Sequence, residues 1–193
     1  MARPTSRTRT PAEKETARRS GRGIRGLVGP AVVVVLVAAV AALVLLDEPL
    51  PGTEFRSLGN RHLASIDEPH SPYNSSPPSS GPHVGGLAPW TAHEDPVPSE
   101  LFLHNLEDGG IVLAYDCPDG CPEIVDGLSE RLEEGRVLVT PYDGIADTTG
   151  ADRRIAAVAW TRVLYLDDLG EESASELDTF ISLFEGVDHH VAG

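Results

Sequence analysis

The sequence predicts an α/β (α+β) fold, a small mixed sheet with two helices, preceded by a single N-terminal transmembrane helix. Three observations indicate this: an uncharged apolar run of twenty residues near the N-terminus, short β-branched runs between residues 110 and 166, and two amphipathic runs of helical period. At 193 residues, the chain allows one domain with appendages. The aliphatic residues from 101 to 187 suffice for one hydrophobic core.

Residues 27–46 form the uncharged run, which consists mainly of Val, Ala and Leu. At about 1.5 Å per residue, such a helix spans roughly 30 Å, the thickness of the hydrocarbon core of a bilayer. A cleaved signal peptide is the main alternative. Its apolar region would be shorter and would end in a small-residue cleavage site, which residues 43–49 lack. We therefore expect a retained anchor that binds the lipid bilayer through residues 27–46.

The tail before this run is basic, since residues 1–26 contain eight Lys and Arg residues and two Glu residues. It has no apolar periodicity, so we expect it to be disordered. Basic residues on one side of a span favour a cytoplasmic position for that side. The sequence therefore predicts a single-pass protein of the cell membrane, with its N-terminus in the cytoplasm and its C-terminal domain extracytoplasmic.

The whole chain has a formal charge of −15 although its tail is positive, so the negative charge is concentrated after residue 46. Such a surface repels nucleic-acid phosphate, and we expect no nucleic acid to bind. A protein partner of unknown kind is compatible with it.

Pro, Gly, Ser and Asn punctuate residues 47–100 and argue against long helices or strands there. We expect residues 47–69 to be a linker. The next stretch contains Tyr73 and Trp90, which are costly to leave in water. Residues 70–100 are therefore predicted to pack as an extended arm on the extracytoplasmic domain, residues 70–187, and residues 188–193 form a short tail.

The expected elements of the domain follow in order. Residues 101–104 read as a short strand or turn, and residues 110–115 as a buried strand between Gly-Gly and Asp-Cys-Pro. A helix begins at Pro122 and ends at Gly135, because apolar residues recur at helical spacing between them. Residues 136–141 form a second strand.

A polar loop is expected at residues 142–154, and residues 155–160 and 163–166 are predicted strands, antiparallel if they form a hairpin. Residues 173–176 read Ser-Ala-Ser-Glu, a capping box that begins a last helix, which ends at Gly186. The order β-α-β, β-β, α resembles a reduced thioredoxin-like fold. In such folds a cysteine pair lies between the first strand and its helix, and here a loop replaces the middle helix.

The two cysteines stand in the segment Cys-Pro-Asp-Gly-Cys-Pro at residues 117–122. Cys117 and Cys121 at a helix start could form a structural disulfide, share a soft metal or exchange with redox partners, or remain inert thiols. The helix N-terminus lowers a thiol pKa, whereas Asp116, Asp119 and Glu123 oppose a further negative charge. The spacing is similar to the copper-site motif of the Sco copper chaperones, which implies a distant histidine as third ligand.

Histidines supply the second candidate site. His104 stands near Glu107 and Asp108, and His83 stands in a Gly- and Pro-rich segment of the arm. Imidazole and carboxylate are ligands of copper and zinc ions. The candidate metal ligands are His70, His83, His104 and Asp108, whereas His62, His93, His189 and His190 read as solvated surface residues.

Three blocks carry a family resemblance: residues 73–83 (Tyr-Asn-Ser-Ser-Pro-Pro-Ser-Ser-Gly-Pro-His), residues 88–90 (Ala-Pro-Trp) and residues 104–110 (His-Asn-Leu-Glu-Asp-Gly-Gly). Together they resemble DUF3105, a bacterial membrane-anchored family of unknown function, over about residues 55–187. The family pattern has a second histidine where Asp108 stands. The resemblance implies placement at a membrane and implies no activity.

No Gly-x-Ser-x-Gly, His-Glu-x-x-His or phosphate-binding loop is present in the sequence. A binding module is therefore favoured over an enzyme. The alternatives are a thiol–disulfide protein that uses Cys117 and Cys121, and a structural or assembly partner without a site. A strand of about six residues extends about 20 Å, so the histidines and the cysteines are expected to form two separate sites.

Overall fold

The computed structural model describes residues 49–190. The predicted transmembrane segment at residues 27–46 and the basic tail lie outside the described residues. From Leu50 onward the chain forms one compact unit. Among the residues described, no helix combines the length and the apolar character that a membrane span requires.

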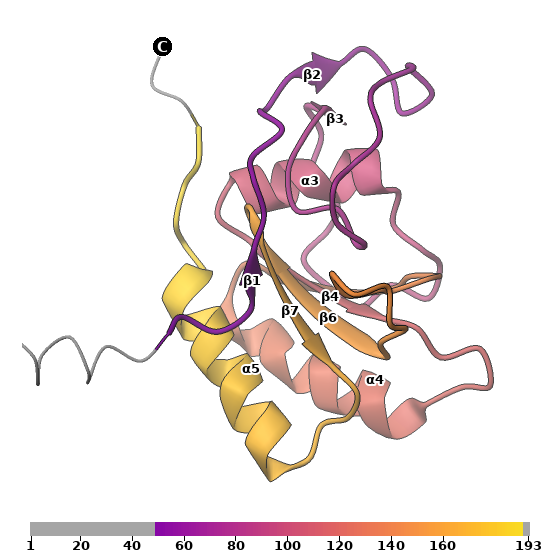
Figure 1. The fold of residues 1–193 in the computed structure, drawn as a ribbon, viewed down its shortest axis with the longest axis vertical. Helices are drawn as coiled ribbons and strands as arrows, with labels where there is room; N and C mark the ends of the chain where they lie inside the picture. Colours follow the sequence, from indigo (N-terminus) through magenta and orange to yellow (C-terminus); the bar gives the residue numbers. More distant parts are fainter. Residues whose placement is uncertain (1–48, 191–193) are drawn as a thin grey trace, which may run out of the picture. The chain divides into compact units, whose positions relative to one another are not determined.

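A five-stranded mixed sheet lies at the centre of this unit (Figure 1). Its strands, in spatial order, are β1 (Thr53–Glu54), β7 (Arg162–Leu166), β6 (Ile155–Ala159), β4 (Ile111–Tyr115) and β5 (Val137–Pro141). β4 and β5 are parallel, and the other neighbours are antiparallel. The predicted α+β class is confirmed, and so is the antiparallel hairpin of β6 and β7.

Both faces of the sheet are buried, which explains why its inner strands are continuous apolar runs rather than alternating ones. In β4, Ile111 and Leu113 contribute to the core on one face, and Val112 and Ala114 contribute to the core on the other. The pairing of Val112 with Leu138 of β5 and Val158 of β6 keeps this division across the sheet.

Helices α4 (Pro122–Ser129) and α5 (Glu171–Phe184) pack on one face, and the 3-10 turn η1 (Glu130–Glu134) extends α4 toward Gly135. The predicted capping box is wrong, because α5 begins two residues before Ser173. The carboxylate of Asp168 instead accepts hydrogen bonds from the Gly170 amide at 2.8 Å and the Ser173 hydroxyl at 3.1 Å. Asp168 thus anchors the turn that begins the helix.

A third helix, α3 (Ser99–Glu107), packs on the other face of the sheet. The prediction of a strand or turn at residues 101–104 is wrong. Phe102, Leu103 and Leu106 are fully buried at helical spacing. The helix has only nine residues and carries an apolar run at its start, so its periodicity is short and its local sequence resembles a strand.

The preceding segment crosses over α3, and two short parallel strands, β2 (His62–Leu63) and β3 (His83–Val84), pair within it. Asn105 of α3 fixes this segment, because its side chain accepts from the Ala88 amide and donates to the Ala88 carbonyl, both at 2.9 Å. Ser79, Ser80 and His83 are fully buried. The Pro- and Gly-rich chain is therefore an ordered layer over the helix.

Two glycines join α3 to β4. Gly109 has a positive φ of 80°, a conformation that side chains disfavour, and a Cβ there would lie 2.7 Å from the Val187 carbonyl oxygen. A Cβ on Gly110 would overlap the Trp90 ring. The turn is thus in close contact with the segment that precedes α3 and with the chain that follows α5.

Candidate metal-binding site

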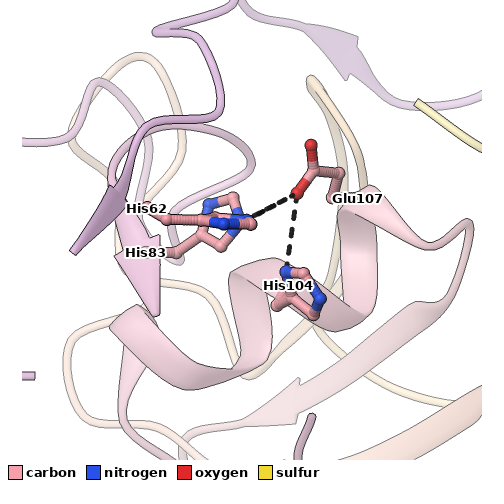
Figure 2. A group of neighbouring side chains, drawn as sticks. All are labelled: His62, His83, His104 and Glu107. Atoms are coloured by element: carbon pink, nitrogen blue, oxygen red, sulfur yellow. Dashed lines mark hydrogen bonds and ion pairs between the residues drawn. The ribbon is translucent and has the colours of Figure 1, made fainter. Parts of the chain in front are cut away.

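Three histidines and one glutamate from three segments converge beside α3 (Figure 2). His62 and His83 are register partners in the parallel β2–β3 pair, which brings their rings to 4.9 Å between centroids. His104 and Glu107 lie three residues apart on α3 and therefore on one side of that helix. One potential ligand atom from each residue lies within 4.8 Å of all the others.

The Oε2 atom of Glu107 lies at the centre of this group. It is 2.9 Å from His83 Nε2 and 3.5 Å from both His62 Nε2 and His104 Nδ1. Four ligands placed tetrahedrally about 2.1 Å from a zinc-sized ion would be separated by roughly 3.4 Å. The three separations from Oε2 are close to that value, and the other ligand atoms lie within 4.8 Å of one another, so the group is small enough to surround one ion.

His83 makes the strongest demand for a cation in this group. Its Nδ1 lies 2.8 Å from the Gly81 carbonyl oxygen, which only accepts hydrogen bonds, so Nδ1 carries a proton. In a neutral ring, the lone pair of Nε2 then faces the Glu107 carboxylate at 2.9 Å. His83 and Glu107 are 0% and 1% exposed. Two buried acceptors in this position need a proton or a metal ion between them.

His104 adds a second unsatisfied atom. Its Nδ1 is buried and has no hydrogen-bond partner among the described residues. Burial is the main reason why the pKa of His104 is lowered, and the neighbouring His83 and His62 lower it further against the opposing effect of Asp108 and Glu107. The ring is therefore neutral near pH 7 and can offer a lone pair to an ion.

Glu107 is held as a carboxylate. Burial alone would raise its pKa, but the hydrogen bond from Asn60 and the neighbouring His83 and His190 together keep the pKa below its ordinary value. Asn60 donates to Oε1 at 2.6 Å. That bond occupies one oxygen and directs the other, Oε2, toward the three imidazoles, as outer hydrogen bonds commonly do for metal ligands.

A second, more exposed group adjoins the first and shares His104 with it. It consists of His104, Asp108 and His190, each of which offers one potential ligand atom within 4.8 Å of the others. His190 Nε2 lies 3.6 Å from Asp108 Oδ1 and 3.8 Å from Glu107 Oε2. His190 belongs to the chain after α5, so the C-terminal end of the described chain reaches the site.

In a comparison with protein-family models, residues 67–189 match the model of a protein of unknown function (DUF3105). The chain belongs to the DUF3105 family. The DUF3105 match includes His83, His104, Glu107 and Asp108, begins after His62 and ends one residue before His190. No curated protein and no solved structure gives a match.

The structure brings together three of the four candidate ligands predicted from this DUF3105 sequence. His83 and His104 belong to the inner group, and Asp108 belongs to the adjoining one. His70 belongs to neither group. Its Nε2 lies 3.2 Å from Glu100 Oε1 and its Nδ1 lies 2.8 Å from the Ser71 carbonyl oxygen.

The sequence did not suggest His62 and His190, which read as solvated surface residues, or Glu107 as a ligand. His62 reaches the group through its pairing with His83, and His190 through the fold of the chain after α5. Glu107 had a usable signal, since it stands three residues after His104, but that spacing carries information only once α3 is known to be a helix.

The cysteines form a disulfide between β4 and α4. Cys121 is buried, whereas Cys117 is partly exposed and lines a pocket of about 420 Å³ with Arg153 and Arg154. The Arg154 guanidinium lies 3.9 Å from Cys117 Sγ. The disulfide follows the carboxyl end of β4, whereas α3 with His104 precedes its amino end. The histidine group and the cysteine pair are therefore separate.

Proposed function

We propose that this protein is a membrane-anchored, extracytoplasmic binding module for a divalent transition metal ion, held by His62, His83, His104 and Glu107. The observation that carries the proposal is the buried contact between His83 Nε2 and Glu107 Oε2 at 2.9 Å, with the proton of His83 committed to the Gly81 carbonyl. A cation between the two acceptors removes their repulsion. It also provides a partner for His104 Nδ1, which otherwise has none in the described chain.

The ligand types favour Zn²⁺ or Cu²⁺. Imidazole nitrogen binds both ions well, whereas Cu⁺ prefers thiolate and thioether sulfur, and Ca²⁺ and Mg²⁺ prefer shells of oxygen. The four-residue group contains three imidazoles, one carboxylate and no sulfur. One negative carboxylate leaves the bound divalent ion with a single net positive charge, which suits a strongly acidic protein.

Four protein ligands favour binding over catalysis. Structural zinc sites are filled by four protein ligands, whereas catalytic sites use three and keep a fourth position for water or substrate. The inner group can supply all four. His62 is half exposed, so the shell has one ligand at the surface through which an ion can enter or leave.

The membrane anchor is part of the proposal and is supported by residues 27–46, whose length and lack of charge fit a bilayer span, and by the basic tail before them. The disulfide supports an extracytoplasmic place for the domain, because disulfides persist in oxidising compartments. Fractionation of cells that express the chain, with protease applied from outside, tests the placement.

Metal titration of the full-length chain, purified without a polyhistidine tag and stripped with a chelator, tests the binding function. We expect one equivalent of Zn²⁺ or Cu²⁺ to bind at micromolar or lower concentration. The variant His93→Ala is the matched control, because His93 is a partly exposed histidine that contacts the Pro89 carbonyl and belongs to neither group. A folded wild-type chain that binds no ion would refute the proposal.

Glu107→Gln separates the loss of a ligand from the loss of the fold. The glutamine oxygen can still accept from Asn60, and its amide can donate to a neutral His83 Nε2, so both contacts are hydrogen bonds in the metal-free variant. We expect this variant to stay folded and to lose metal binding by about a hundredfold or more. Full binding in this variant would mean that Glu107 is not a ligand.

Thiol–disulfide exchange at Cys117 and Cys121 is a second candidate function. The observation that favours it is the partly exposed sulfur of Cys117 in an open pocket beside Arg154, next to a buried Cys121 at the start of α4. The order β4-α4-β5, β6-β7, α5 agrees with a reduced thioredoxin-like arrangement. A reduction potential above about −300 mV would support exchange, and a lower one a structural bridge.

A further inference from the structure

The chain after α5, residues 186–190, which we call the C-terminal strap, is bonded to the end of α3. The Gly186 amide donates to the Gly109 carbonyl at 2.7 Å, and the His189 amide donates to the Glu107 carbonyl at 2.9 Å. The His189 ring also stacks on Trp160 at 6.1 Å. The strap is thus fixed to the backbone of Glu107, whose carboxylate contacts the three imidazoles of the inner group.

The strap presents His190 with one nitrogen free for an ion. His190 Nδ1 lies 2.8 Å from Asp188 Oδ1, and the same oxygen accepts from the His190 amide at 2.9 Å. Because Nδ1 donates a hydrogen bond to Asp188, Nε2 is the nitrogen that faces Asp108 Oδ1, at 3.6 Å, and it can bind an ion once it is deprotonated. A ring nitrogen oriented by a carboxylate on its other side is a common arrangement of metal-binding histidines.

Exposure falls from this outer group to three of the four members of the inner one, whereas His62 of the inner group is 50% exposed. The side chains of His190 and Asp108 are 46% and 27% exposed, that of the shared His104 is 13% exposed, and those of Glu107 and His83 are 1% and 0% exposed. An ion from solvent can therefore meet His190 and Asp108, or His62 of the inner group, before it meets the buried ligands. The negative charge of the domain raises the local concentration of cations at this entrance.

We propose that His104, Asp108 and His190 form an outer binding set that captures a divalent transition metal ion and passes it to the inner set through His104. The proposal rests on the proposed function, since it assumes that the inner set binds the ion. A neutral imidazole has one lone pair, so His104 serves one set at a time. The outer set is consequently a stage on the path and adds no second tightly bound ion.

Stopped-flow kinetics of the full-length chain with Zn²⁺ and a chromogenic chelator test this. We expect His190→Ala to slow both metal uptake and metal release by about tenfold, because a stage on the path serves both directions. The affinity of the inner set should stay within about twofold of the wild type. Asp108→Asn should behave in the same way, and His93→Ala should change neither rate.

The other outcomes overturn the proposal in distinguishable ways. Faster release with weaker affinity in His190→Ala would make His190 a ligand of the inner ion. Slower uptake with unchanged release would mean that His190 acts only by long-range attraction of the ion. Unchanged rates would mean that His190 takes no part in metal uptake. A wild-type chain that binds no Zn²⁺ would refute the proposed function itself, and the outer set with it.

Discussion

The histidine group and the disulfide lie at the two ends of β4 and are satisfied in opposite ways. Cys117 and Cys121 are four residues apart in the sequence and satisfy each other by a covalent bond. His62, His83 and Glu107 come from segments far apart in the sequence, and the nitrogens of the two rings face the buried Glu107 carboxylate, a contact that needs a proton or a metal ion. The disulfide therefore needs no further group, whereas the histidine group needs a cation, either a proton or a metal ion, between its nitrogens and the carboxylate.

The largest expected effect on the stability of the fold comes from metal binding to the histidine group. An ion that binds only the folded state stabilises it by about 4 kcal/mol at a thousandfold excess over Kd. Thermal unfolding of the full-length chain with Zn²⁺ and with a chelator measures this shift. The double variant Cys117→Ser/Cys121→Ser should keep the whole metal-induced shift, since the histidine group and the disulfide are separate. A loss of the shift would show that metal binding depends on the disulfide.

Removal of the disulfide should have the next largest effect on stability. Because the bridge closes a loop of only about five residues, the chain-entropy model gives about 2 kcal/mol for its loss. Denaturant unfolding of Cys117→Ser/Cys121→Ser without metal measures this cost. The double serine variant leaves no free thiol. A loss of stability well above 4 kcal/mol would indicate that the disulfide loop holds other elements in place besides α4.

Asn60→Ala tests the orientation of the carboxylate. The lost hydrogen bond frees Glu107 to rotate and removes one of the interactions that keep its pKa low. We expect metal affinity to fall about tenfold, or about 1.4 kcal/mol. Asn74→Ala is the matched control, because Asn74 donates to the Arg56 carbonyl outside the site. Equal affinities in the two variants would remove Asn60 from the site.

The smallest expected effect is a pH dependence of stability that arises from His104 in the histidine group. Burial lowers the pKa of His104 below its ordinary value of 6.5, so the unfolded chain binds more protons than the folded one in that range. The stability that this contributes is present above pH 6.5 and is lost as the pH falls through the folded pKa. Unfolding of the metal-free chain between pH 5 and pH 8 should show this slope, and His104→Gln should flatten it.

The sheet and the two later helices were predictable, because each leaves a local pattern in the sequence. The apolar run 111–115, the hairpin near Thr161 and the periodic apolar residues of α5 each lie within one short window. Helix α3 left no such pattern, since nine residues with Leu-Phe-Leu near the start read equally well as a strand. Its burial against the sheet decides its conformation.

The site was predictable only in part, for a related reason. His83 and His104 were recognisable as candidates, but the partnership of His62 with His83 depends on a two-residue parallel pair that joins segments twenty-one residues apart. The place of His190 depends on where the chain goes after α5. No periodicity or spacing encodes either contact, so single-sequence reasoning had no means to find them.

The glycine pair at residues 109 and 110 has a consequence for genetics. Neither residue has a side-chain donor atom, yet one adjoins Val187 of the chain leading to His190 and the other adjoins Trp90 of the segment that crosses α3. A larger residue at either position would displace a segment that carries a proposed metal ligand. A random screen for variants that fail to retain metal should therefore recover substitutions at both glycines alongside substitutions of the histidines themselves.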